Sequence, residues 1–142
     1  MQYRNRRLMV PVVVAGLALA ACHQKGATPA KIKPATVEHV EGSELSRITL
    51  TERAAQRLDI KTTAARTAAG RMVVPYAAVL YDAKGQTWVY TSPEPLKFVR
   101  HAISVAYIDG DQAVLTAGPP AGTQVVTVGG QELFGAEFEV GH

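Results

Sequence analysis

The chain has 142 residues, 47% hydrophobic and 19% charged, a length that accommodates one domain rather than two. The formal net charge of +3 comes from residues 1–21, which hold three of the 15 basic residues and none of the 12 acidic ones, so residues 22–142 are formally neutral. This balance excludes the clustered basic surface that nucleic-acid binding requires, and the single cysteine, Cys22, excludes an intrachain disulfide or a CxxC metal or redox pair.

The first segment, residues 1–21, is organised like a secretory signal peptide. Arg4, Arg6 and Arg7 form a positive region, and every residue in 8–21 is apolar, Gly or Pro. That apolar stretch is shorter than the ~20 residues that a membrane-spanning helix needs. We therefore expect residues 1–21 to be removed from the mature chain.

The signal segment leads into Leu19-Ala20-Ala21-Cys22, which resembles the lipobox of bacterial lipoproteins. The resemblance implies cleavage before Cys22 and acylation of that cysteine, with acyl chains such as palmitate holding the protein on a bilayer. A plain cleaved signal peptide and an uncleaved anchor are the alternatives. In the lipoprotein family, Asp after the cysteine commonly retains a protein in the inner membrane of enteric bacteria. His23 at this position slightly favours the outer membrane, with the protein facing the periplasm.

Residues 22–44 are predicted to be the acylated cysteine and a flexible tether. They contain Gly26, Pro29, Pro34 and Gly42, scattered charges and no aromatic residue, which is a composition typical of a linker. As a coil, the segment has an r.m.s. span of ~25 Å. The folded part would thus sit clear of the lipid headgroups.

Residues 45–142 are predicted to form the folded domain. Its first strand is expected at 46–50, where apolar and polar residues alternate. Thr51 is a good N-cap and Glu52 suits the first turn of a short helix. One face of this helix would carry Ala54, Ala55 and Leu58. An extended segment, 60–67, follows.

The remainder of the domain reads mainly as strands separated by turns. Pro75 suits an edge strand or a bulge, and Asp109-Gly110 between two apolar runs is a strong hairpin signal. Trp88 and Tyr90 should lie on one face of their strand. The expected strands are 72–81, 87–91, 96–108, 112–115 and 124–128, with a loose final strand at 132–140. The fold class is therefore predicted to be mainly β, a small barrel or sandwich-like domain with one short helix.

The order of these segments is similar to that in periplasmic adaptor subunits (membrane fusion proteins) of tripartite efflux systems driven by RND-type pumps. The similar stretches are Val74-Pro75-Tyr76-Ala77-Ala78-Val79, Trp88-Val89-Tyr90, Phe98-Val99-Arg100, Gly118 to Gly122, Val125 to Gly129, and earlier Ile48 to Thr51 and Arg57 to Thr62.

Full-length adaptors place a second barrel, a biotinyl-lipoyl-like domain and usually a helical hairpin between the early and late stretches. Here the early stretch ends near Gly70 and the late one begins at Arg71, and no heptad pattern occurs. The resemblance therefore implies a membrane-proximal domain alone, which would be unable to reach an outer-membrane channel.

The function expected from this resemblance is that of a non-catalytic, membrane-anchored accessory subunit of an RND-type efflux system. Its partners would be the inner-membrane pump or a full-length adaptor. The alternative is a small ligand-binding or sensing lipoprotein of the envelope, and a third possibility is an adaptor remnant without a retained role.

No residue pattern predicts an enzyme, a cofactor or a metal site. The four histidines, His23, His39, His101 and His142, are far apart, and no ligand spacing for a metal occurs. Asp109 and Asp111 suit a turn better than acid–base chemistry, because they flank Gly110.

Aromatic residues offer the one candidate binding surface. Tyr76, Trp88 and Tyr90 are the predicted partner-docking residues, since interfaces are enriched in Tyr and Trp. The alternative is that these side chains serve core and edge packing.

Overall fold

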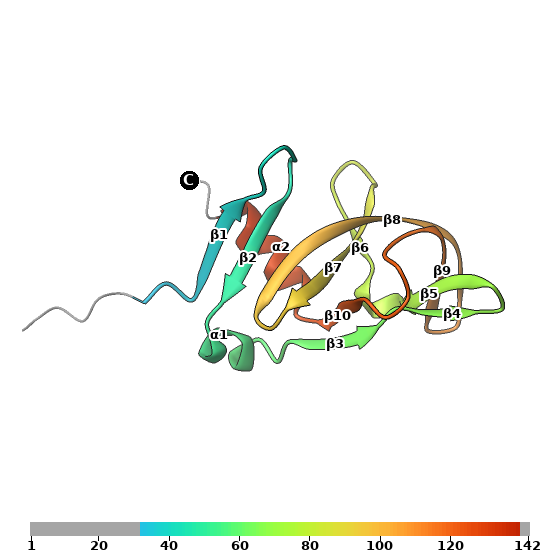
Figure 1. Cartoon of the computed structure of the whole chain (residues 1–142), viewed down its shortest axis with the longest axis horizontal. Coiled ribbons are helices and arrows are strands. Elements are labelled where there is room, and N and C mark those ends of the chain that lie inside the picture. The colour runs from blue at the N-terminus through green and yellow to red at the C-terminus, as the bar shows by residue number, and fades with distance from the viewer. Residues whose placement is uncertain (1–31, 140–142) are drawn as a thin grey trace, which may run out of the picture. The chain divides into compact units, whose positions relative to one another are not determined.

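The computed structural model describes residues 32–139, which form ten strands, two α-helices and one 3-10 turn (Figure 1). In chain order these are β1 (Ala35–His39), β2 (Ser46–Leu50), α1 (Glu52–Arg57), β3 (Lys61–Ala64), β4 (Arg66–Ala68), β5 (Arg71–Pro75), η1 (Tyr76–Ala78), β6 (Leu80–Tyr81), β7 (Thr87–Glu94), β8 (Lys97–Asp109), β9 (Gln112–Ala117), β10 (Gln124–Val128) and α2 (Gly130–Glu139). The predicted mainly β class is confirmed.

The ten strands form one curled antiparallel sheet, in which seven follow the order β3-β10-β7-β8-β9-β5-β4. Off this path, β2 pairs with β8, β1 pairs with β2, and β6 pairs with β7. The long strand β8 belongs to two parts of the sheet: Lys97–Val99 pairs with β2, whereas Ser104–Asp109 pairs with β9. The β8–β9 register shifts between Ser104 and Tyr107. Such bulges bend a strand, which accounts for the curl of the sheet at this point.

The central strands β7 and β10 have a hydrophobic core on each face. Val89 and Val125 belong to the first core, and their chain neighbours Tyr90 and Val126 belong to the second core. This alternation follows from the period of two along a strand. The prediction that Trp88 and Tyr90 share a face is confirmed, since both pack in the second core.

Helix α1 begins as the sequence predicts. Thr51 is the N-cap, and its Oγ1 accepts a hydrogen bond from the Ala54 amide at 3.2 Å. Ala54 is buried and Leu58 packs against the second core. The predicted hairpin is also confirmed: β8 and β9 pair up to Asp109 and Gln112, with Gly110 in the left-handed conformation at φ 59°.

Three segments differ from the sequence-based prediction. The predicted strand 72–81 is divided into β5, η1 and β6, and Pro75 ends β5, which lies between β9 and β4 and is not an edge strand. Residues 35–39, predicted as part of the tether, form β1 and pair with β2, so that Val37 lies opposite Ile48. The predicted final strand at 132–140 is wrong, because Gly130–Glu139 form α2, which packs on β1, β2 and β7. Within the described residues, no helix is both long and apolar enough to cross a membrane.

Candidate functional site

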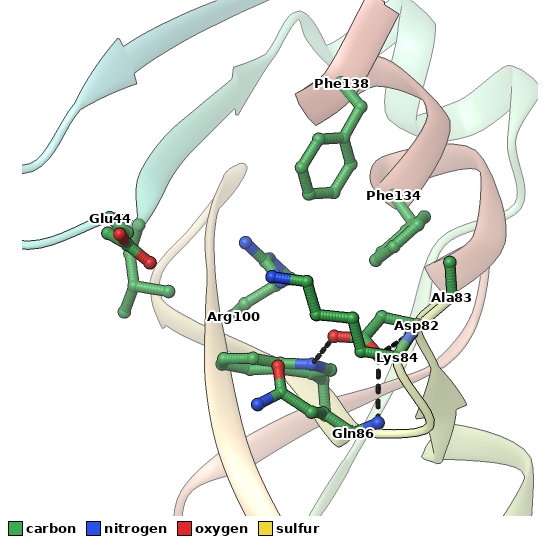
Figure 2. Close-up of a pocket in the computed structure, with 10 residues that line it drawn as sticks. Glu44, Asp82, Ala83, Lys84, Gln86, Arg100, Phe134 and Phe138 are labelled. Carbon is green, nitrogen blue, oxygen red and sulfur yellow. Dashed lines mark hydrogen bonds between the residues drawn. The ribbon is translucent and has the colours of Figure 1, made fainter.

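A pocket of about 530 Å³ opens between α2, the β6–β7 loop and the end of the β1–β2 hairpin (Figure 2). Small-molecule sites typically have volumes of ~300–1,000 Å³. The lining residues are Glu44, Leu45, Asp82, Ala83, Lys84, Gln86, Trp88, Arg100, Phe134 and Phe138. The pocket thus combines aromatic walls with a few charged groups.

A buried ion pair adjoins this pocket through Arg100, which lines it. Arg100 on β8 stands opposite Tyr90 on β7, and α2 brings Glu137 to both. Glu137 Oε2 accepts a hydrogen bond from Arg100 Nε at 2.8 Å and another from Tyr90 Oη at 2.5 Å. The side chains of Arg100 and Glu137 are 8% and 1% exposed. A buried salt bridge therefore connects β8 to α2, which are distant in sequence.

The ion pair joins one nitrogen of Arg100, Nε, to one oxygen of Glu137, Oε2. Glu137 Oε1 is buried and accepts no hydrogen bond from the described residues. Arg100 donates only through Nε, and neither of its Nη groups donates to any described residue. The Nη edge of the guanidinium is thus left for whatever enters the pocket.

Three aromatic rings surround the Arg100 guanidinium. Its Cζ lies 4.5 Å from the ring centre of Trp88, 5.0 Å from that of Phe138 and 5.8 Å from that of Phe134. Each distance is within the ~6 Å over which cation–π attraction operates. The rings therefore stabilise the cation and hold it in place.

The β6–β7 loop fixes the position of Trp88. Asp82 Oδ1 accepts from the Lys84 and Gln86 amides, and Oδ2 accepts from Trp88 Nε1 at 3.1 Å. Desolvation alone would raise the pKa of Asp82, but these hydrogen bonds and the Lys84 charge outweigh it and lower the pKa. Asp82 thus stays ionised, and its carboxylate accepts hydrogen bonds from its own loop and from Trp88.

The hydroxyl of Tyr90 is held protonated. Burial, followed by the hydrogen bond and charge of Glu137, raises the pKa of Tyr90 far above its ordinary value. Tyr90 is a hydrogen-bond donor to Glu137 and supplies no nucleophile or base.

The three predicted docking residues differ in exposure. Tyr76 lies in η1 and is 44% exposed, and Trp88 is half-buried in the pocket wall. Tyr90 is 0% exposed, so its side chain adds nothing to a surface. Whether Tyr76 and Trp88 contact a partner stays a prediction.

Other sequence-based candidates lie elsewhere. Leu19, Ala20, Ala21 and the lipid-attachment site Cys22 are outside the described residues, as are His23 and His142. Within residues 32–139, no group of three His, Cys, Asp or Glu side chains is placed to hold a metal ion.

Of the residues of this site, sequence reasoning singled out only Trp88 and Tyr90 and missed the others, Arg100 among them. Phe134, Glu137 and Phe138 were missed because their segment was predicted as a strand. The spacing of Leu133 and Phe134 with Glu137 and Phe138, four residues on, was the helical signal that could have found them.

Comparisons of this chain with protein-family models, with curated proteins and with solved structures give no match.

Proposed function

We propose that this protein is a non-catalytic, lipid-anchored accessory subunit of an RND-type efflux system. The main support is how the two adaptor-like stretches combine. The early stretch supplies β2 and β3, which pair with β8 and β10 of the late stretch, so both contribute to a single sheet. A domain assembled from two stretches in this way is what the resemblance to adaptors implies.

The connection between the two stretches supports the same proposal. Strands β4 and β5 form a tight hairpin, with Ala69 and Gly70 both at positive φ in its turn. This is the point at which full-length adaptors carry their additional domains. In the described range the longest helix is α2, with ten residues, so this domain has no helical arm to reach a channel. Its role would be confined to contacts near the membrane that anchors it.

The envelope location is tested by changing the acylation site. In cells expressing the full-length chain, we expect the wild type in the membrane fraction and labelled by a palmitate analogue. The Cys22→Ser variant should lose the label and leave the membrane fraction. Labelling that persists in this variant would contradict the anchor.

The partner is tested by photo-crosslinking in intact cells. A photoreactive amino acid replaces Tyr76 in η1 and, as a control, the exposed Gln56 on α1. We expect adducts with an RND-type pump or a full-length adaptor from position 76 and few from position 56. Adducts from position 76 with other envelope proteins, and none with an efflux component, would refute the proposal.

The second candidate is a small ligand-binding lipoprotein of the envelope, which the Arg100 pocket favours. A ligand that binds only the native state raises the melting temperature. Thermal-shift measurements on the full-length chain therefore test this candidate independently of any protein partner.

A further inference from the structure

We propose that the Arg100 pocket binds a small carboxylate that carries an apolar or aromatic body. The inference rests on the ligand-binding candidate and gives it a chemical class. It is independent of the efflux role.

The first argument is the unused donor edge of Arg100. A guanidinium carries five N–H donors, of which Glu137 occupies the one on Nε. The four N–H donors on the Nη atoms have no acceptor among the described residues, although the Arg100 side chain is only 8% exposed. Paired N–H groups of a guanidinium fit the two oxygens of a carboxylate, and such charge-assisted bonds are stronger than neutral ones.

The second argument is that the aromatic rings are already used by a cation. Trp88, Phe134 and Phe138 direct ring faces towards the Arg100 guanidinium. A ligand ammonium would have to compete with that internal cation and would meet its positive charge. The ring arrangement therefore favours an anion bound to Arg100 over a cation bound to the rings.

The third argument is the balance of the other charges in the pocket. In Figure 2 the Lys84 side chain extends towards Arg100, and Lys84 forms no ion pair with any described residue. Asp82 faces its own loop and is occupied by three hydrogen bonds. Because Arg100 is already paired with Glu137, Lys84 is the lining cation without an ion pair and Glu44 is the lining carboxylate without a hydrogen bond, within the described part of the chain. A ligand carboxylate at the Nη edge would therefore have Lys84 as its second cation.

Glu44 and the pocket volume limit the ligand. A second negative charge would meet the Glu44 carboxylate, so a monoanion fits better than a polyanion such as a nucleotide. The remaining walls, Leu45, Phe134 and Phe138, suit an apolar body, and about 530 Å³ limits its size. The ligand class is a hydrophobic monocarboxylate.

The test uses Trp88, the single tryptophan of the chain, as a fluorescent reporter in the pocket wall. The full-length chain in a non-ionic detergent is titrated with 4-phenylbutyrate and with its neutral amide, 4-phenylbutyramide. We expect a saturable change in Trp88 emission with the acid and at least tenfold weaker binding of the amide. Equal affinities, or no change with either compound in a folded sample, would overturn the proposal.

Charge variants assign the binding to named groups. Lys84→Gln should weaken binding of the acid severalfold, Glu44→Gln should strengthen it, and neither should affect the amide. Lys33→Gln is the matched control, because Lys33 is an exposed lysine that does not line the pocket. An effect of Lys33→Gln as large as that of Lys84→Gln would point to non-specific charge attraction and refute the site.

Arg100 itself is tested by two variants, because loss of Arg100 alone strands the Glu137 charge in the interior. Arg100→Lys keeps the charge and removes the paired donors, and the double variant Arg100→Gln/Glu137→Gln removes both charges together. Both should lose at least tenfold in affinity for the acid. Binding that survives in either folded variant would refute the assignment, and the crosslinking test of the efflux role would be unaffected.

Discussion

The Glu137→Ala substitution tests whether the buried ion pair holds α2 on the sheet. In the wild type, Glu137 is 1% exposed in its side chain and accepts from both Arg100 and Tyr90. Its removal leaves the Arg100 cation at 8% exposure without an anion, and the Tyr90 hydroxyl without an acceptor. Breaking a buried pair by removing one partner costs about 3–5 kcal/mol.

That loss is large for a domain of this size. Small domains have unfolding free energies of about 5–15 kcal/mol, and 1 kcal/mol shifts the melting temperature by about 4–8 °C. We therefore expect Glu137→Ala to lower the melting temperature by more than about 12 °C. Urea unfolding, followed by Trp88 emission and by far-UV circular dichroism, measures the free energy directly.

Two controls separate the ion pair from a general effect on α2. Glu132→Ala removes an exposed acid from the same helix and should change the unfolding free energy by less than about 1 kcal/mol. The double variant Arg100→Met/Glu137→Leu replaces the pair with apolar groups and should be more stable than Glu137→Ala alone. A loss below about 1 kcal/mol for Glu137→Ala would refute the reasoning.

Three further predictions concern local structure. Gly129→Ala should destabilise by about 1–2 kcal/mol in urea unfolding, since Gly129 has φ 89°, whereas Gly135→Ala, in open space on α2, should be neutral or stabilising. Thr51→Ala removes the N-cap bond of α1 and should lower the unfolding free energy by about 1 kcal/mol in the same assay. The pKa of Asp82 is lowered in the fold, so its contribution is present at neutral pH and is lost as the pH falls through that lowered value. An acid titration of Trp88 emission should show this transition, and Asp82→Asn should abolish it.

Much of the fold could be predicted because its signals are local. The alternation at 46–50, the Thr51 cap and the Asp109-Gly110 turn each depend on neighbouring residues, and all three occur as predicted. Strand β1 is different: Ala35 to Glu38 alternate apolar and polar residues, but the surrounding prolines, glycines and charges are typical of a linker, and the strand forms by pairing with β2. Pairing between segments is not visible in the pattern of either segment alone.

The error at α2 has a similar physical origin. Gly129-Gly130 favours a turn, and Gly135 lowers the helix propensity of the segment that follows. Phenylalanine at positions 134 and 138 also suits a strand. The helix is instead favoured by tertiary packing, because Leu133 is 0% exposed in the second core and Glu137 meets Arg100.

The same error concealed the candidate site, and this connects the fold to the pocket. Arg100 and Glu137 are 37 residues apart, and neither is unusual in its own segment. Once α2 packs on the sheet, it supplies the anion that fixes Arg100 and two of the rings that surround it. The ion pair that secures the last helix therefore also orients the free Nη edge into the pocket. Binding of a carboxylate there should stabilise the docked helix, because the ligand engages Arg100 only in the arrangement that Glu137 enforces.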